Sequence, residues 1–392
     1  MIAWFRYICL IVSLIITLPE LLSAQRLVSQ RQEDVEAGLL YNESVYILSN
    51  YSCLSSNSPE KLSLDELLRK QIEGFYFYLK RDTETNVLLL RKPDGTFTPF
   101  SESLEAIKTA LDADSTKVMT LFLDFYVETE LESSFKEIGL MEYVLEYDTK
   151  NGWPSLKDML SSGKRLVVFE VQKHLNSPSW LHNMRDFVEH TDADWGNQPE
   201  GVESFDERLK KNLSLFTGYK FLETSRGNSN DISALARQTP YLIESFKRAW
   251  IRDGRVPNFV LVDKYYAWLD VSLVTFRNFD IIYGAVTNNN ELLNYVNWDG
   301  MSNYTTGKYC FPREPGAELM LSPISPGYRI EPATVYVSGT QRKAFAGDFK
   351  ARPLRIDEDI EIYLPFEGDE KDGSSNHNLT VSRNVEFIQD PI

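Results

Sequence analysis

Two long apolar runs, joined by a helical connection, constrain the fold of this chain more than any other feature. Val118–Phe125 reads VMTLFLDF and Arg165–Val171 reads RLVVFEV. Neither run alternates polar with apolar residues, so each is expected to be a strand buried on both faces, as in a parallel sheet covered by helices. Trp153–Gly163 predicts a helix before the second strand, with Pro154 in its first turn and Gly163 at its end.

The same alternation of strands and helices extends over roughly 250 residues and predicts a β/α barrel with adjacent, parallel strands. Its further strands are predicted at Val45–Ser49, Gly74–Leu79, Val87–Leu90 and Phe259–Asp263. Further helices are predicted at Leu62–Ile72, where Ser63 and Glu66 suit a capping box, at Ser101–Leu111 and at Val271–Phe279. After about Asp280 the helical period fades, and a smaller β-rich region is expected.

The net charge of −16 narrows the classes of partner. Nucleic-acid binding is not expected, because phosphate backbones select basic surfaces. The excess of acid also argues against strong nonspecific adsorption to anionic lipid heads, although a local basic pocket and a membrane-surface partner stay open.

The N-terminus predicts a signal peptide over residues 1–24, with Arg6 before a short apolar run and Ala24 at the cleavage point. An uncleaved anchor is the alternative. We expect a secreted or cell-surface protein, or a periplasmic one if the source is a Gram-negative bacterium. Cys53 and Cys310 remain after cleavage, and both a disulfide between them and two free thiols stay open.

The motifs WPSL at Trp153 and GKRLVVF at Gly163 resemble the X domain of the phosphatidylinositol-specific phospholipase C superfamily. The resemblance implies a TIM-type β/α barrel over residues 25–280, a place among the phosphoric diester hydrolases and a link to lipid metabolism. In that family two histidines act as general base and general acid, while Arg or Ca²⁺ stabilises the phosphate charge.

The chain departs from the family pattern at the catalytic positions. Asn50 stands where the family has its first histidine, and Asn cannot exchange a proton near neutral pH. Tyr76 replaces an arginine of the second strand, and Arg91 takes the place of the second histidine. The resemblance therefore implies a degenerate catalytic site.

Other residues are candidates for what remains of the site. Asp124 and Asp263 end strands, and His174 opens a series with His182 and His190 that is read as a relocated acid/base, a metal site or exposed loop histidines. Asp124 is the one metal-ligand candidate, but Ca²⁺ takes six to eight oxygens, so no cofactor is expected. The candidates for ligand binding are Arg91, Lys92, Tyr76, Tyr265 and Trp268.

The C-terminus suggests a further unit. Residues 281–358 are expected to form a β-rich linker region, and 359–392 contain YLPFEGD and DGSSN, which resemble the opening of a laminin-G/concanavalin-like sandwich. A sandwich needs well over a hundred residues, so either the chain continues beyond Ile392 or this segment is a lone hairpin.

Three functions follow as expectations. The first is a catalytically degenerate barrel that binds a phospho-sugar, a lipid headgroup or a glycan. The second is a divergent phosphodiesterase acting on phosphoinositide or a related lipid. The third is a glycan-binding adhesion module in which the barrel is a scaffold. The sequence leaves the oligomeric state undetermined.

Overall fold

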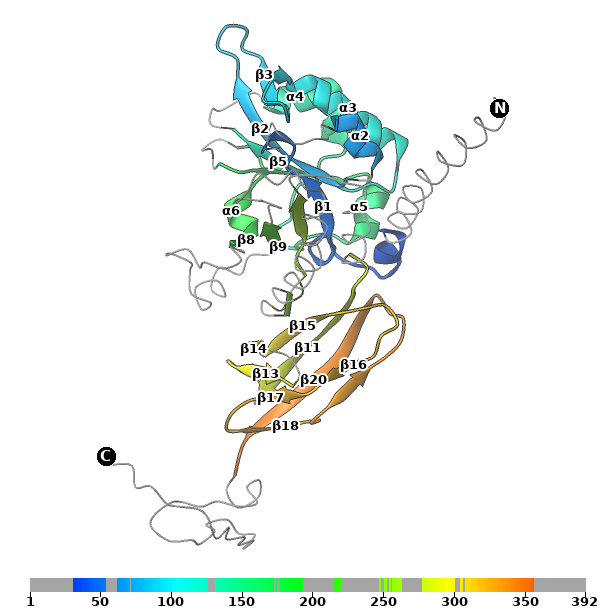
Figure 1. The fold of residues 1–392 in the computed structure, drawn as a ribbon, viewed down its shortest axis with the longest axis vertical. Coiled ribbons are helices and arrows are strands. Elements are labelled where there is room, and N and C mark those ends of the chain that lie inside the picture. Colours follow the sequence, from blue (N-terminus) through cyan, green and yellow to red (C-terminus); the bar gives the residue numbers. More distant parts are fainter. Residues whose placement is uncertain are drawn as a thin grey trace, which may run out of the picture.

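The computed structural model describes two domains, an α/β domain and a smaller β-rich domain next to it (Figure 1). The described residues are 31–53, 62–70, 72–125, 131–172, 174, 177–192, 215–219, 247, 250–251, 254, 256–262, 277–299, 304–305 and 307–355. The predicted signal peptide, the C-terminal segment 359–392 and the candidates Asp263, Tyr265 and Trp268 lie outside them. No helix in these ranges is long and apolar enough to cross a bilayer.

Eight parallel strands form the centre of the first domain. Their hydrogen-bonded path runs β7-β6-β5-β2-β1-β10-β9-β8. If β7 and β8 are placed next to each other, this path becomes a ring in which the strands follow one another in chain order, from β1 to β10. The strands are β1 (Tyr46–Ser49), β2 (Gly74–Arg81), β5 (Met119–Asp124), β6 (Leu166–Glu170), β7 (Leu181–Asn183), β8 (Val188–Asp192), β9 (Leu215–Tyr219) and β10 (Phe259–Val262). This order is that of a β/α barrel, and the predicted fold class is confirmed.

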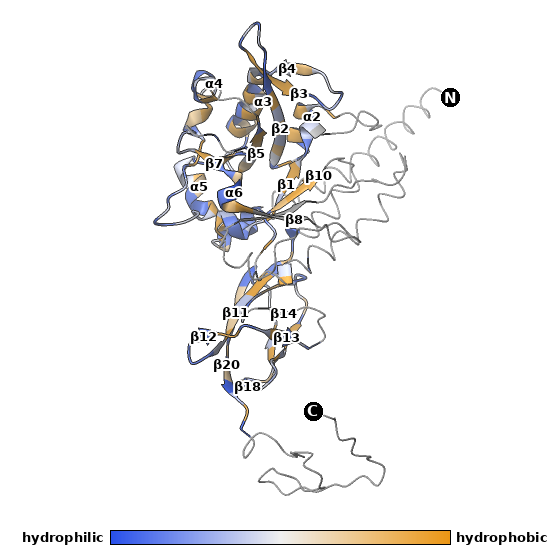
Figure 2. Cartoon of the chain, turned by 90° about the vertical axis from the view of Figure 1, so that its left-hand side faces the viewer, coloured by the Kyte–Doolittle hydropathy of each residue, from blue (hydrophilic) through white to orange (hydrophobic). Residues whose placement is uncertain are grey.

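Aromatic rings meet inside the barrel from strands that are far apart in the path. Phe259 on β10 lies 5.2 Å, centroid to centroid, from Phe122 on β5 and 6.1 Å from Phe169 on β6. Phe122 and Phe169 stack on each other at 5.2 Å. Strands separated along the path can meet in this way only because the sheet curves around a common core. Figure 2 shows apolar residues concentrated along these strands.

For one predicted barrel strand, the predicted direction was wrong. Val87–Leu90 was expected to be parallel to its neighbours, but β3 (Leu88–Arg91) pairs antiparallel with β2 and with β4 (Phe97–Pro99). The reason is the length of the connection, since only a few residues separate β2 from β3. A parallel crossover requires about a dozen or more residues. The segment therefore forms a hairpin at the end of β2 instead of a barrel strand.

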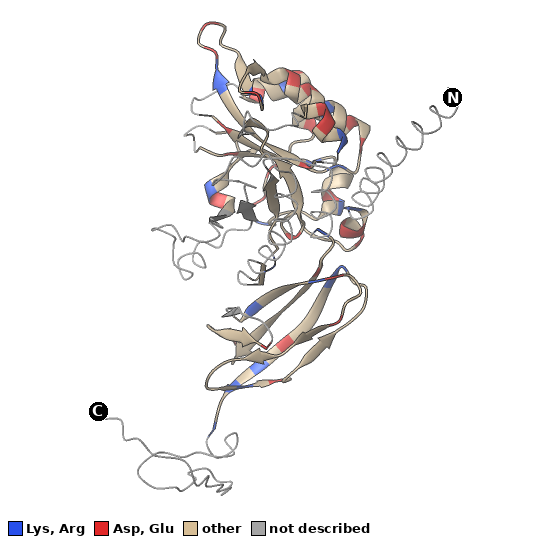
Figure 3. Cartoon of the chain, viewed as in Figure 1, with Lys and Arg blue, Asp and Glu red and all other residues tan. Residues whose placement is uncertain are grey.

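The helices cover the outer surface of the barrel strands. They are α2 (Leu64–Arg69), α3 (Phe100–Ala113), α4 (Leu131–Ile138), α5 (Leu156–Ser162) and α6 (Met184–Phe187). Of these, α2, α3 and α5 correspond to the three helical segments that the sequence predicts before β2, β5 and β6. Most of the predicted helix Val271–Phe279 lies outside the described residues. Ser63 caps α2 and forms the predicted capping box with Glu66. In α5 the N-cap is Ser155, so Pro154 precedes the helix instead of opening it, and Gly163 ends it with φ 73°. Figure 3 shows that charged residues are frequent along α2, α3 and α4.

The second domain is built from β-sheets that pack face to face. Its strands are β11 (Asp280–Asn288), β12 (Glu291–Leu292), β13 (Val296–Trp298), β14 (Tyr304–Thr305), β15 (Lys308–Arg313), β16 (Leu319–Leu321), β17 (Pro323–Ile324), β18 (Tyr328–Glu331), β19 (Val335–Val337) and β20 (Lys343–Pro353). Trp298, from the sheet of β13, β14 and β17, lies 4.9 Å from Phe311 and 5.8 Å from Phe349 of the larger sheet. These contacts make one shared core, separate from that of the barrel.

Cys310 lies on β15 as a free, buried thiol. Trp250 Nε1 donates a hydrogen bond to Cys310 Sγ at 2.9 Å, and burial raises the pKa of this thiol to about 12. Of the two open interpretations of the cysteines, the structure shows a free thiol at this position.

Buried ion pairs join the two domains at the end of the barrel where the parallel strands begin. Arg342, the residue before β20, donates to Asp34 Oδ1 at 2.7 Å and to the carbonyl oxygens of Arg277 and Phe279. Glu73, just before β2, lies 2.5 Å from Arg31 and 3.0 Å from Arg277. Arg313 pairs with Asp280 at 2.8 Å. We call these seven residues the interdomain cluster, and it holds four arginines against three carboxylates.

Breaking this cluster is expected to destabilise the whole chain. Asp34→Asn leaves the guanidinium of Arg342 without its closest anionic partner, and a buried charge left in this way costs about 3–5 kcal/mol. Urea unfolding of the purified chain measures the loss. The matched control is Lys343→Ala, because Lys343 also crosses between the domains, to Glu43 at 2.6 Å, but both side chains are 25% exposed. The control should cost about 1 kcal/mol or less, and an equal loss in both variants would contradict the argument.

Candidate functional site

The carboxyl ends of the parallel strands gather polar side chains at one end of the barrel, which we call the rim. In β/α barrels this end is where active and binding sites form. The residues of the rim that the structure describes are Asn50 after β1, Tyr76 on β2, Asp124 on β5, Glu170 on β6, Asn183 on β7, and His174 and Ser177 in the segment after β6.

Two of the predicted residues are hydrogen-bonded to each other. Tyr76 Oη donates to Asp124 Oδ2 at 2.7 Å. The register of β2 and β5 sets Tyr78 opposite Asp124, so Tyr76 lies diagonally across from Asp124 on the same face of the sheet. The second carboxylate oxygen, Asp124 Oδ1, is buried and has no hydrogen-bond partner among the described residues. Tyr76 thus orients a carboxylate that can accept one more donor.

Glu170 is a site residue that the sequence reasoning missed. Its side chain is only 2% exposed and accepts three hydrogen bonds. Ser177 Oγ donates to Oε2 at 2.5 Å, Asn183 Nδ2 donates to Oε1 at 3.3 Å, and the His174 ring contacts Oε2 through Nδ1 at 3.0 Å. The available signal was the one acidic residue that interrupts the apolar run RLVVFEV, at the carboxyl end of its strand.

The contact with Glu170 gives His174 the arrangement of an acid/base group. When Nδ1 donates to a carboxylate, Nε2 of the neutral ring carries the lone pair and can accept a proton. The imidazole also stacks on Phe125, with the ring centroids 4.4 Å apart and the planes 4° from parallel. Because Phe125 follows Asp124 directly, this stacking links the Glu170 end of the rim to the Asp124 end.

Asn50 directly follows β1, and Arg91 is the last residue of β3, next to this region. Asn50 is buried, with 2% of its surface exposed. Ser52 Oγ donates to the Arg91 carbonyl at 2.9 Å and accepts from the Tyr78 backbone N–H at 2.8 Å. This bridge holds the end of the β3 hairpin against β2. The Arg91 side chain is exposed and that of Lys92 is half-buried, so solvent reaches this basic pair at the end of β3.

His182 lies outside the rim. It is 4% exposed on β7, its Nε2 contacts the Leu145 carbonyl at 3.2 Å, and its ring packs among Trp153, Phe169 and Phe187. The expectation of three exposed loop histidines is therefore wrong for this residue, because its ring fills an aromatic core. The side chain of His190 is outside the described residues.

The described rim does not fit a Ca²⁺ ion. Such an ion takes six to eight oxygen ligands. Asp124 offers one open carboxylate oxygen, while both oxygens of Glu170 already accept hydrogen bonds. Across the described ranges no three His, Cys, Asp or Glu side chains come together as metal ligands.

Comparison with known families supports the assignment of the barrel. Residues 90–199 match the family model PI-PLC X 1, which describes the X domain of phosphatidylinositol-specific phospholipase C. The resemblance to this superfamily is confirmed. The matched segment includes Arg91, Asp124, Glu170 and His174, whereas Asn50 and Tyr76 precede it. The likeness of the C-terminal segment to a laminin-G domain stays a prediction.

Solved structures with some likeness to the chain include two bacterial phosphatidylinositol-specific phospholipases C. Phosphatidylinositol-specific phospholipase C from Listeria monocytogenes has a TM-score of 0.39 at 13% identity, over 62% of this chain and 98% of the other. A variant of the Staphylococcus aureus enzyme has a TM-score of 0.37 at 12% identity, over 61% and 97%. Comparison with curated proteins gave no match.

The burial of His182 predicts a pH effect. Burial lowers the pKa of His182 below its ordinary value of 6.5. The unfolded chain therefore binds a proton that the folded chain does not, so the contribution of this residue to stability is full above pH 6.5 and is lost as the pH falls below it. NMR titration of the ring C–H signals should show that His182 is neutral at a pH where histidines of the urea-unfolded chain are half protonated. A midpoint at or above the unfolded value would contradict this prediction.

Proposed function

We propose that the rim of this phospholipase C-like barrel binds the polyol ring of a phospho-sugar or inositol-type lipid headgroup without cleaving it efficiently. The observation that supports the proposal is the pair of oriented carboxylates, Asp124 fixed by Tyr76 and Glu170 fixed by Ser177 and Asn183. Both lie at the end of the barrel where ligands of this fold bind.

Carboxylates in this arrangement suit ring hydroxyls. A hydroxyl donates to an anionic oxygen in a charge-assisted hydrogen bond, which is stronger than a neutral one. Asp124 Oδ1 is an acceptor with no partner among the described residues, and the Tyr76 bond holds it in place. Two carboxylates repel a phosphate at the centre of the rim, so the phosphate would lie toward Arg91 and Lys92 at the end of β3. The ligand would then span the rim from its acidic centre to its basic edge.

Weak turnover follows from the residues at the family's acid/base positions. Asn50 and Arg91 stand there, and neither transfers a proton near neutral pH. Each missing acid/base group typically removes about 10²–10⁴-fold of rate. The predicted signal peptide supports action outside the cell, and a lipid headgroup ligand would bring the barrel to a membrane surface.

A second function, a divergent phosphodiesterase, is favoured by one observation. His174 contacts the buried carboxylate of Glu170 through Nδ1, which is the arrangement of a general base held by an acidic partner. In this alternative His174 takes a proton from a hydroxyl of the substrate, in place of the histidine that the family carries near Asn50.

A hydrolysis assay separates the two functions. The purified mature chain is incubated with phosphatidylinositol vesicles and with a soluble inositol phosphodiester, with and without Ca²⁺. We expect little or no cleavage above that of the heat-unfolded chain. Robust cleavage that His174→Gln abolishes would establish the second function and contradict the first.

Binding is tested by calorimetry with inositol 1-phosphate. Asp124→Asn keeps the size of the side chain but replaces an acceptor oxygen by an amide, and Arg91→Ala removes the cation at the edge. Hydrogen bonds to charged groups contribute about 1.5–3 kcal/mol, so each variant should bind about tenfold or more weakly. Arg329→Ala is the control, because Arg329 is exposed in the β-rich domain, where it pairs with Glu331. No binding by the wild-type chain at millimolar ligand, or equal binding by all variants, would contradict the proposal.

A further inference from the structure

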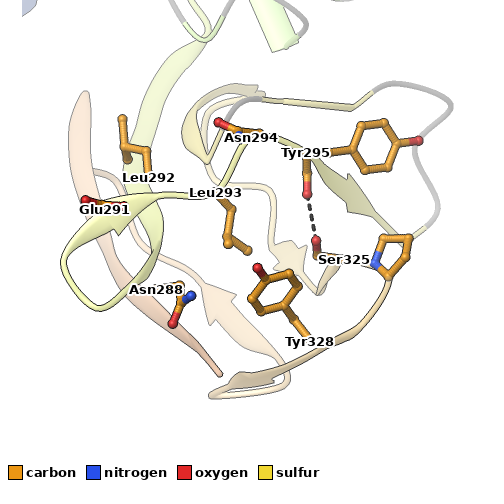
Figure 4. Close-up of a pocket in the computed structure, with 9 residues that line it drawn as sticks. Asn288, Glu291, Leu292, Leu293, Asn294, Tyr295, Ser325 and Tyr328 are labelled. Atoms are coloured by element: carbon orange, nitrogen blue, oxygen red, sulfur yellow. Dashed lines mark hydrogen bonds between the residues drawn. The ribbon is translucent and has the colours of Figure 1, made fainter. Parts of the chain in front are cut away.

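The β-rich domain contains a cavity that the barrel function does not use. It has a volume of about 420 Å³ and is lined by residues of the β11–β12 turn, the segment after β12 and the β17–β18 turn (Figure 4). The lining residues are Asn288, Glu291, Leu292, Leu293, Asn294, Tyr295, Ser325, Pro326 and Tyr328. A volume of this size lies within the range of sites for small ligands.

The side chains around the cavity combine aromatic surfaces with neutral polar groups. Figure 4 shows Asn288 from β11, Leu293 after β12 and Tyr328 from β18 around one space, with Tyr295 on its far side. The amides of Asn288 and Asn294 each offer donors and an acceptor, and Glu291 adds a carboxylate. No lysine or arginine is among the residues that line the cavity, so the site does not select an anion.

The backbone around the cavity is preorganised. Asn288 and Glu291 are paired across the two-stranded turn, and Asn289 and Asn290 between them have φ values of 50° and 69°. Two consecutive left-handed residues define a tight hairpin turn, for which Asn is well suited. On the opposite side Ser325, which is 7% exposed, donates through Oγ to the Tyr295 carbonyl at 2.8 Å. This bond ties the β17–β18 turn to the segment that carries Tyr295.

We propose that this cavity binds a neutral saccharide. The apolar face of a sugar ring packs on a tyrosine ring, while its hydroxyls both donate to and accept from amide and carboxylate groups. Tyr295, which is 41% exposed, offers the ring face. Asn288, at the edge of the rigid β11–β12 turn, and Asn294 offer the amides. A cationic ligand could use Glu291 but would not use the amide N–H donors, and a purely apolar ligand would use neither. The inference concerns the second domain and does not rest on the proposed function of the barrel.

Saturation-transfer NMR on the full chain tests this site. The probes are the methyl glycosides of glucose, galactose, mannose and N-acetylglucosamine at millimolar concentration, with tetramethylammonium as the cationic alternative. We expect transfer to at least one glycoside and none to tetramethylammonium. Absence of transfer to all four glycosides, or transfer to tetramethylammonium alone, would overturn the proposal.

Substitutions then place the binding in this cavity. Tyr295→Ala removes one ring face and Asn294→Ala removes an amide, and we expect each to weaken binding of the glycoside about five- to tenfold. Tyr336→Ala is the matched control, since Tyr336 is 71% exposed in the same domain and does not line the cavity. Asp124→Asn in the barrel should also leave glycoside binding unchanged. Equal weakening by Tyr336→Ala, or weakening by Asp124→Asn in place of Tyr295→Ala, would assign the sugar to another site.

Discussion

The contact of Arg342 with Asp34 is the interaction on which the arrangement of the two domains depends. Arg342 directly precedes β20, the last described strand, and Asp34 lies close to the first described residue, so this one pair joins segments that are 308 residues apart in the chain. The same guanidinium binds the carbonyl oxygens of Arg277 and Phe279, where the chain passes into β11. A buried charge that loses its partner is strongly destabilising. Separating the two domains would leave these charges unpaired, so the ion pairs as well as the packing keep the domains together.

The barrel could be predicted from the sequence because its strands carry a local signal. Val118–Phe125 and Arg165–Val171 are mostly apolar without alternation, and the Ser63–Glu66 capping box begins a helix whatever lies beyond it. The predicted direction of β3 was wrong. Strand direction depends on the length of the connection to the preceding strand, and the apolar content of a strand does not report this length. The interdomain cluster could not be predicted, since Arg342 and Asp34 are 308 residues apart and no local pattern links them.

The candidate site also contains residues that could be predicted from the sequence and residues that could not. Asp124 was found because it ends a strand, and Tyr76 was found through the resemblance to the second strand of the family; the structure joins them by a hydrogen bond. Glu170 was missed, since a single acidic residue in an apolar strand is equally typical of a structural cap. Its role depends on Ser177 and Asn183, which reach it from later segments of the chain. His182 shows the opposite error, because a spacing of eight residues places no constraint on which histidines face a common ligand.

The position of the interdomain cluster has a geometric consequence. It closes the end of the barrel where the strands start, so the rim lies at the other end. In the second domain β11 leaves the cluster at Asp280 and reaches the cavity at Asn288. Figure 1 shows the two domains following one another along the long axis of the molecule. An occupant of the rim and an occupant of the cavity would therefore be carried by two domains that buried ion pairs join, and this joint would set the distance between them.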